Sequence, residues 1–224
     1  MSLSRKPIYL FADSQLLCSN QDGGWRLSSV LEFIDRESPR AAYIGASNND
    51  TPAFYSIFLH AMGVIGIENV RMIASAFPPE DALFVNDADL ILLAGGETER
   101  GWRVFVSTGL REIILKRYID GAVLIGVSAG AVQLGLLGRS NETLFDTFKL
   151  VPFVVSVHEE RQNWSSLRDA IRSTKRGVTG IGIPSGGGAR YSADGSLEAI
   201  RYALHEFSYD DKQFNHSLRP PAAE

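Results

Sequence analysis

Ser128 lies between Gly126 and Gly130, with one residue separating it from each glycine, and it comes after the apolar run at residues 122–125. Such a run is typical of a buried strand. A chain that turns sharply from strand into helix needs glycines there, because side chains would collide in so tight a turn. The pattern predicts a nucleophile elbow that lifts the Ser128 hydroxyl above a sheet. The N–H of Ala129 would then lie at a helix N-terminus, where it can donate to a developing oxyanion.

A second glycine turn follows the apolar segment at residues 90–94, which ends in Gly95-Gly96-Glu97-Thr98. In a parallel sheet this turn lies at the same edge as Ser128. The backbone N–H of Gly96 is then a candidate second oxyanion donor, because no side chain shields it. Alternatively, the turn needs glycine only for its dihedral angles.

A serine hydroxyl is a poor nucleophile unless a neighbouring base accepts its proton. Of the four histidines, His158 closes the apolar segment at residues 153–157 and should reach the same sheet edge. A histidine at a strand end can also be an ordinary surface residue. We expect surface or core roles for His60, His205 and His216.

Composition limits the partners, cofactors and cellular location that we expect. The chain has 224 residues and a formal net charge of -4, and it carries no lysine or arginine cluster, so a nucleic-acid partner is not expected. Cys18 is the single cysteine, which excludes an intrachain disulfide and, with four histidines, gives no zinc pattern. No metal or cofactor is expected. No apolar stretch approaches the ~18 residues of a membrane span, and no signal pattern opens the chain, so we expect a cytoplasmic protein with no membrane contact.

The segments that position these residues alternate between strand and helix. Strands are predicted at residues 8–11, 41–45, 70–74, 90–94, 123–127, 153–157 and 180–184, and helices at 26–36, 53–62, 103–119 and 164–173, the last capped by Asn163. This alternation predicts a single α/β domain over residues 1–224, with a doubly wound, mainly parallel sheet and helices on both faces. Functional residues should gather beyond the carboxyl ends of the strands.

The composition changes after residue 184. Three glycines lead into a predicted β-hairpin over residues 189–201, turning at Ala193-Asp194-Gly195, at one end of the sheet. From Tyr209 the chain is polar, and we expect a flexible tail there.

Together these motifs resemble the peptidase E and cyanophycinase family of serine peptidases. The resemblance rests on the elbow, the Gly95-Gly96-x-Thr98 turn, residues 145–153 running to His158, and the segment 180–184. It implies a fold similar to class I glutamine amidotransferases and an exopeptidase or dipeptidase activity on short aspartyl peptides. It also implies Ser128 as nucleophile, His158 as general base, and the amides of Gly96 and Ala129 as the oxyanion hole.

This chain departs from the family where the third triad member is expected. The family places a glutamate after the late strand, whereas this chain has Ser185. A hydroxyl can hold the imidazole tautomer but cannot stabilise the imidazolium as a carboxylate does. Three interpretations stay open: a Ser-His-Ser enzyme, an acid recruited from elsewhere such as Glu159 or Asp146, or a non-catalytic binding relative. A smaller departure is Ala94 and Glu97 around the glycine pair.

Substrate-binding residues are expected near the base. The resemblance implies an arginine that holds an acidic side chain, for which Arg161 and then Arg168 are candidates, although both also suit a solvated helix. Glu159 and Glu160 would repel an acidic substrate and favour a free amino terminus. Residues 48–50 also reach the functional edge, where they bind substrate or form the turn.

The interpretation we favour is a peptidase acting on a short peptide, with a homodimer left open. An α/β-hydrolase esterase is the other enzyme class considered, but in that fold the histidine lies near the chain end, after an acid.

Overall fold

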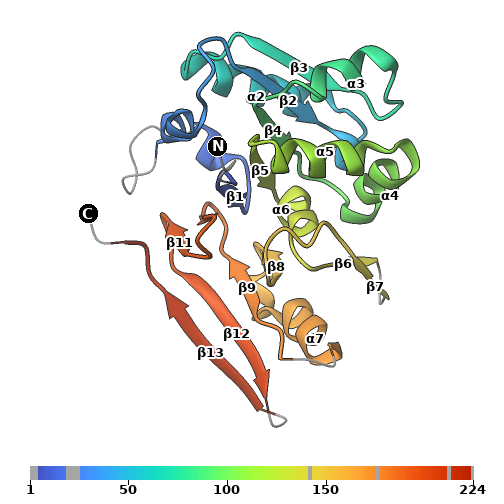
Figure 1. The fold of residues 1–224 in the computed structure, drawn as a ribbon. Helices are drawn as coiled ribbons and strands as arrows, with labels where there is room; N and C mark the ends of the chain where they lie inside the picture. Colours follow the sequence, from blue (N-terminus) through green and yellow to red (C-terminus); the bar gives the residue numbers. More distant parts are fainter. Residues whose placement is uncertain (1–4, 19–25, 141–142, 175–176, 211–212, 223–224) are drawn as a thin grey trace.

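The computed structural model describes residues 5–18, 26–140, 143–174, 177–210 and 213–222. Its centre is a seven-stranded sheet of order β11-β10-β1-β5-β4-β2-β3 (Figure 1). Its five parallel strands are β1 (Ile8–Phe11), β2 (Arg40–Ile44), β3 (Asn69–Ile73), β4 (Leu90–Leu93) and β5 (Val123–Val127). The hairpin of β10 (Gly188–Tyr191) and β11 (Leu197–Ile200) adds to the β1 edge, antiparallel, as predicted.

Helices cover both faces of this sheet, which confirms the predicted fold class. Alternate residues of a strand point to opposite faces. On one face, Ile8 and Leu10 belong to a core shared with α3 (Pro79–Val85), α4 (Thr98–Thr108), α5 (Leu110–Ile119) and α6 (Ala129–Leu134). On the other, Tyr9 and Phe11 pack with α1 (Gln15–Cys18), the 3₁₀ helix Leu27–Phe33 and α2 (Pro52–Val64).

A second sheet has four strands in the order β13-β12-β9-β8, and His158 and Ser185 follow two of them. Its strands are β8 (Val154–Val157), β9 (Gly180–Ile183), β12 (Leu204–Asp210) and β13 (Gln213–Arg219), and α7 (Ser165–Ser173) packs on it through Leu167 and Ile171. We expected β8 and β9 in the central sheet. They pair in parallel with each other, so His158 and Ser185 still follow strands that end at the same edge. The hairpin of β6 (Leu137–Ser140) and β7 (Thr143–Asp146) forms a separate two-stranded sheet.

Three predictions of local structure are wrong. The helix predicted at 103–119 is two helices, because Gly109 has a φ of 77° that a regular helix cannot continue. The segment 26–36 forms only the 3₁₀ helix. The tail from Tyr209 is not loose: Tyr209 lies opposite Phe214 with ring centroids 4.7 Å apart, and such cross-strand aromatic pairs stabilise a hairpin. No helix within the described ranges is long and apolar enough to cross a membrane.

Candidate active site

The turn from β5 into α6 is the predicted elbow. Ser128 has a φ of 50° and a ψ of -110°, an unusual backbone conformation for a residue with a side chain. A Cβ at Gly130 would lie 2.0 Å from the carbonyl oxygen of Leu93, and one at Gly126 would lie 2.6 Å from the Gly130 backbone. Both positions therefore need glycine, because the backbone of α6 passes in contact with that of β4 at Gly130 and with that of β5 at Gly126.

His158 meets Ser128 across the two sheets. The Ser128 Oγ lies 3.0 Å from the His158 Nε2, within hydrogen-bonding distance. His158 follows β8 with a φ of 44°, and its N–H donates to the carbonyl of Ile183 at 2.9 Å, which fixes its backbone on β9. The imidazole is exposed, so a substrate can reach both groups.

Two backbone amides are available beside the serine. Within the described ranges, the N–H groups of Gly96 and Ala129 donate to no other protein group. Gly96 has a φ of 138°, and a Cβ there would lie 2.1 Å from the carbonyl oxygen of Ser47. Gly95 lies so near Ser128 that an added Cβ would be 3.2 Å from the serine Cβ. The glycine pair thus allows the turn after β4 to approach Ser128.

The loop after β2 holds this glycine turn in place. Asn48 donates from Nδ2 to the carbonyl of Gly95 at 2.9 Å and to the hydroxyl of Tyr43 at 3.1 Å. Its Oδ1 accepts from the N–H of Thr51 at 3.0 Å, at the start of α2. Asp50 accepts from the N–H of Ser75 at 2.7 Å. Of the alternatives for residues 48–50, the structure shows the turn, and Asn48 also reaches the cavity.

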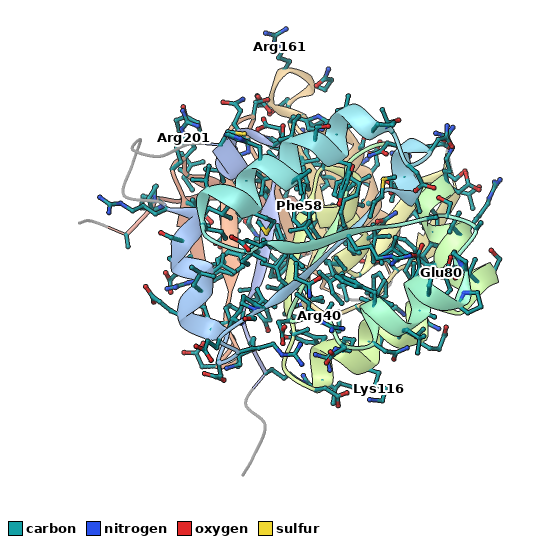
Figure 2. The ribbon with its side chains drawn as sticks, turned by 90° about the horizontal axis from the view of Figure 1, so that it is seen from above. Arg40, Phe58, Glu80, Lys116, Arg161 and Arg201 are labelled. Carbon is teal, nitrogen blue, oxygen red and sulfur yellow. The ribbon has the colours of Figure 1, made fainter. Side chains whose placement is uncertain are left out.

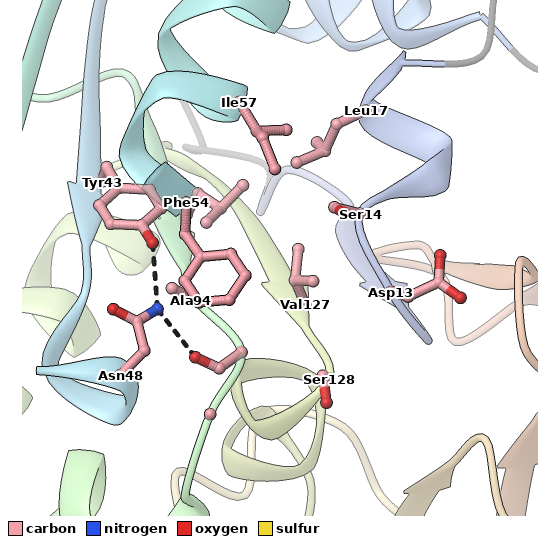
Figure 3. A pocket seen from close by; sticks show the side chains of 13 residues that line it. Asp13, Ser14, Leu17, Tyr43, Asn48, Phe54, Ile57, Ala94, Val127 and Ser128 are labelled. Carbon is pink, nitrogen blue, oxygen red and sulfur yellow. Dashed lines mark hydrogen bonds between the residues drawn. The ribbon is translucent and has the colours of Figure 1, made fainter. Parts of the chain in front are cut away.

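A cavity of about 240 Å³ opens beside Ser128 (Figure 3). Most of its lining is apolar. It is formed by Asp13, Ser14, Leu17, Tyr43, Asn48, Phe54, Ile57, Leu92, Ala94, Gly95, Gly96, Val127 and Ser128. Burial raises the pKa of Tyr43, so its hydroxyl stays neutral and serves as a hydrogen-bonding group.

The predicted hydrogen bond between Ser185 and the His158 imidazole is not formed. No hydrogen bond to the Nδ1 of His158 occurs in the described part of the chain, from Ser185 or from any other residue. The N–H of Ser185 instead donates to the Glu160 Oε1 at 3.3 Å. Burial favours the neutral form of Glu160, but hydrogen bonds from the side chain and backbone of Ser185 and the charge of His158 outweigh it, so the pKa of Glu160 is lowered. Sequence reasoning did not single out Glu160 as a partner of Ser185; its position two residues after His158 was the available signal.

The acids considered from the sequence have other roles. Glu159 accepts from the Ser156 hydroxyl at 2.9 Å and from the Ser166 N–H at 2.7 Å, so it caps α7 in place of the predicted Asn163. Asp146 lies on β7 and pairs with Lys149 at 2.7 Å. Neither carboxylate bonds to His158.

The two candidate arginines lie away from the cavity. Figure 2 shows Arg161 at the tip of a loop that projects from the body of the molecule, and its side chain is exposed. The Arg168 guanidinium lies over the ring of Phe214, 4.6 Å from its centroid. Neither is among the cavity-lining residues, so the structure does not place them where they could hold a side chain bound in the cavity.

The remaining histidines do not reach the serine. His60 is exposed on α2. His205 and His216 lie on β12 and β13, with Nδ1 and Nε2 3.1 Å apart. Burial and the nearby His216 lower the pKa of His205.

Comparisons with known proteins agree with this geometry. The model of peptidase family S51 matches residues 16–200. "Uncharacterized peptidase YgaJ" of Bacillus subtilis (strain 168) is 27% identical over 104 residues, which are 46% of this chain and 45% of that protein. The chain thus aligns with less than half the length of this curated relative.

Two solved structures share the fold. A peptidase from an acI-B1 Actinobacterium superposes with a TM-score of 0.71 at 15% identity, over 97% of this chain and 99% of that one. A putative peptidase E protein from Listeria monocytogenes EGD-e superposes with a TM-score of 0.58 at 17% identity, over 95% and 98%. The family match extends from α1 to β11 and confirms the resemblance read from the motifs, so the chain belongs to peptidase family S51.

Proposed function

We propose that this protein is a serine peptidase that cleaves short peptides through an acyl-enzyme. The observation that carries the proposal is the 3.0 Å contact between the Ser128 Oγ and the His158 Nε2 at a strained strand-to-helix turn. An elbow serine within reach of an imidazole is the arrangement that nucleophilic acyl transfer requires. A cytoplasmic location is part of the proposal and is supported by the single cysteine, Cys18.

The proposed reaction begins with attack by Ser128 on the peptide carbonyl. His158 accepts the proton of Ser128 as the hydroxyl attacks the peptide carbonyl, and the resulting oxyanion accepts hydrogen bonds from the N–H groups of Gly96 and Ala129. His158 then gives the proton to the leaving amine, which departs and leaves the acyl group on Ser128. A water molecule, deprotonated by the same imidazole, hydrolyses the ester and restores the serine.

In this proposal, Glu160 supplies the negative charge that the family takes from its late glutamate. Ser185, at the family's acidic position, acts through Glu160: its N–H and hydroxyl hold the Glu160 carboxylate on the side of His158. A carboxylate near an imidazolium stabilises the charge formed during attack. Both Glu160 and His158 are exposed, so solvent screens the interaction and its contribution is modest.

A fluorophosphonate reagent should form one adduct, on Ser128, because only an activated serine attacks phosphorus at a useful rate. The replacement His158→Ala should slow labelling strongly, since the hydroxyl then lacks its base. Intact mass and peptide mapping measure the adduct and its position. Labelling of another serine, or none in folded protein, would contradict the assignment.

Replacing Glu160 with glutamine should lower kcat by about fivefold, equal to about 1 kcal/mol, because an exposed charge pair contributes on this scale. The variant Glu160→Asp, which keeps the carboxylate, should retain part of the activity that Glu160→Gln loses. Steady-state kinetics of both variants measure these effects.

The adjacent Glu159→Gln is the matched control. It weakens the cap of α7, because an amide oxygen accepts less strongly than a carboxylate, and should lower stability by less than about 1 kcal/mol without lowering kcat. An unchanged kcat in Glu160→Gln, with Ser185→Ala also unaffected, would show that the base needs no acid from this loop.

A further inference from the structure

The wall of the cavity beside Ser128 is built from apolar side chains on four elements. Leu17 comes from α1, Phe54 and Ile57 from α2, Leu92 from β4 and Val127 from β5. In Figure 3, Leu17, Phe54, Ile57 and Val127 surround one space above the serine. The Phe54 side chain is 52% exposed although it lines a cavity, so its ring is open to a ligand.

The charge of the cavity disfavours an acidic group. Asp13 is the one charged residue among its described lining residues, and no lysine or arginine stands with it. The Asp13 carboxylate accepts from the N–H of Gly186 at 2.7 Å and from that of Gln15 at 2.9 Å, which hold it in place. A substrate carboxylate here would lose its water, gain no cationic partner and lie near a like charge.

The position of the cavity identifies the part of the substrate that enters it. Ser128 and Gly96 both line it, so the carbonyl carbon under attack and its oxygen lie at its mouth. The side chain carried by that acyl residue is the nearest substituent that can point into the space. A volume of about 240 Å³ is smaller than the ~300–1,000 Å³ of sites for drug-sized ligands and suits a single side chain.

We infer that the residue on the amino side of the cleaved bond is large and apolar, of the leucine or phenylalanine type, and that its side chain occupies this cavity. The inference rests on the proposed peptidase function and names its substrate class. It differs from the aspartyl preference that the family resemblance implies. Removal of the apolar side chain from water against Phe54 and Ile57 supplies the binding free energy.

The test compares kcat/KM for dipeptides that differ only in the first residue: leucine, phenylalanine, alanine, aspartate or glutamate, followed by the same second residue. Leucine and phenylalanine substrates should be cleaved at least tenfold faster than aspartate and glutamate substrates. Leucinal, an aldehyde that forms a reversible adduct with the serine, should inhibit at least tenfold more tightly than the aldehyde of aspartate. Preference for the acidic members in both assays would overturn the inference.

Variants on one helix locate the specificity. Phe54→Ala should lower kcat/KM for the leucine substrate about tenfold and leave the alanine substrate nearly unchanged. Leu59→Ala is the matched control, because Leu59 is 46% exposed on the same helix but does not line the cavity. Equal losses for both substrates in Phe54→Ala would contradict a side-chain site there.

The fluorophosphonate reaction separates the two failures. If Ser128 is labelled and the acidic aldehyde binds more tightly, the substrate class is wrong and the peptidase function stands. If Ser128 is not labelled in folded protein and neither aldehyde binds, the peptidase function fails, and with it the substrate class.

Discussion

Replacing Ser128 with alanine should lower kcat on a cleavable dipeptide by about 10⁶-fold, since losses of this size follow removal of the nucleophile from comparable triads. The hydroxyl is the only group positioned both against the His158 Nε2 and beside the amides of Gly96 and Ala129 among the described residues. Without it no acyl-enzyme forms, and the remaining rate comes from oxyanion stabilisation of direct attack by water. Single-turnover and steady-state kinetics measure the loss.

Ser14→Ala is the control for this loss, because Ser14 is a second serine that lines the same cavity. It should change kcat by less than about threefold, since no step of the proposed reaction uses its hydroxyl. Both variants should unfold at nearly the temperature of the parent protein. Comparable activity in Ser128→Ala and the parent would remove the serine mechanism altogether.

The second large effect concerns stability. Gly130→Ala should lower the free energy of unfolding by about 3 kcal/mol or more, because the added Cβ would lie 2.0 Å from the Leu93 carbonyl oxygen. Backbone cannot yield as the end of a flexible side chain can, so α6 must move away from β4. The Ser128 hydroxyl moves with α6, and activity should fall in the fraction that stays folded. Urea denaturation measures the first effect.

The matched substitution Gly63→Ala should have the opposite sign. Gly63 also lies in a helix, α2, but a Cβ there would meet nothing within 4 Å. Alanine should therefore stabilise the protein by about 0.5–1 kcal/mol, because glycine loses more backbone entropy on folding. If the two variants changed stability alike, the tight passage of α6 over β4 would be refuted.

Much of the site could be predicted because each part has a local cause. The glycines around Ser128 are required by close backbone contacts at the turn, and glycines on both sides of a serine directly after an apolar run are typical of an elbow. Gly96 and His158 follow strands, and parallel strands bring their ends to one edge. The resemblance to the family added the order of these motifs along the chain.

The errors arose where distant residues decide the structure. Glu160 is linked to Ser185 only because β8 and β9 end side by side, so no spacing along the chain shows the pair. The β12–β13 hairpin looks polar, and its stabilising aromatic pairs become visible only when Phe207 is aligned with His216. Gly109 is the exception, because its cause is local: the sequence shows a glycine inside a helical pattern, and its φ of 77° ends α4.

Ser128 and His158 belong to different sheets. Ser128 follows a strand of the seven-stranded sheet and His158 a strand of the four-stranded one. Among the described residues the two sheets share no ladder, only an isolated bridge between Ala199 on β11 and Pro221, which follows β13. The 3.0 Å distance between the Ser128 Oγ and the His158 Nε2 therefore depends on how the two sheets are positioned relative to each other. A rigid displacement of one sheet by little more than an ångström would disconnect the proton transfer while every ladder hydrogen bond stayed intact. The catalytic rate should then respond more strongly to a change in the relative position of the two sheets than any spectroscopic signal from secondary structure does.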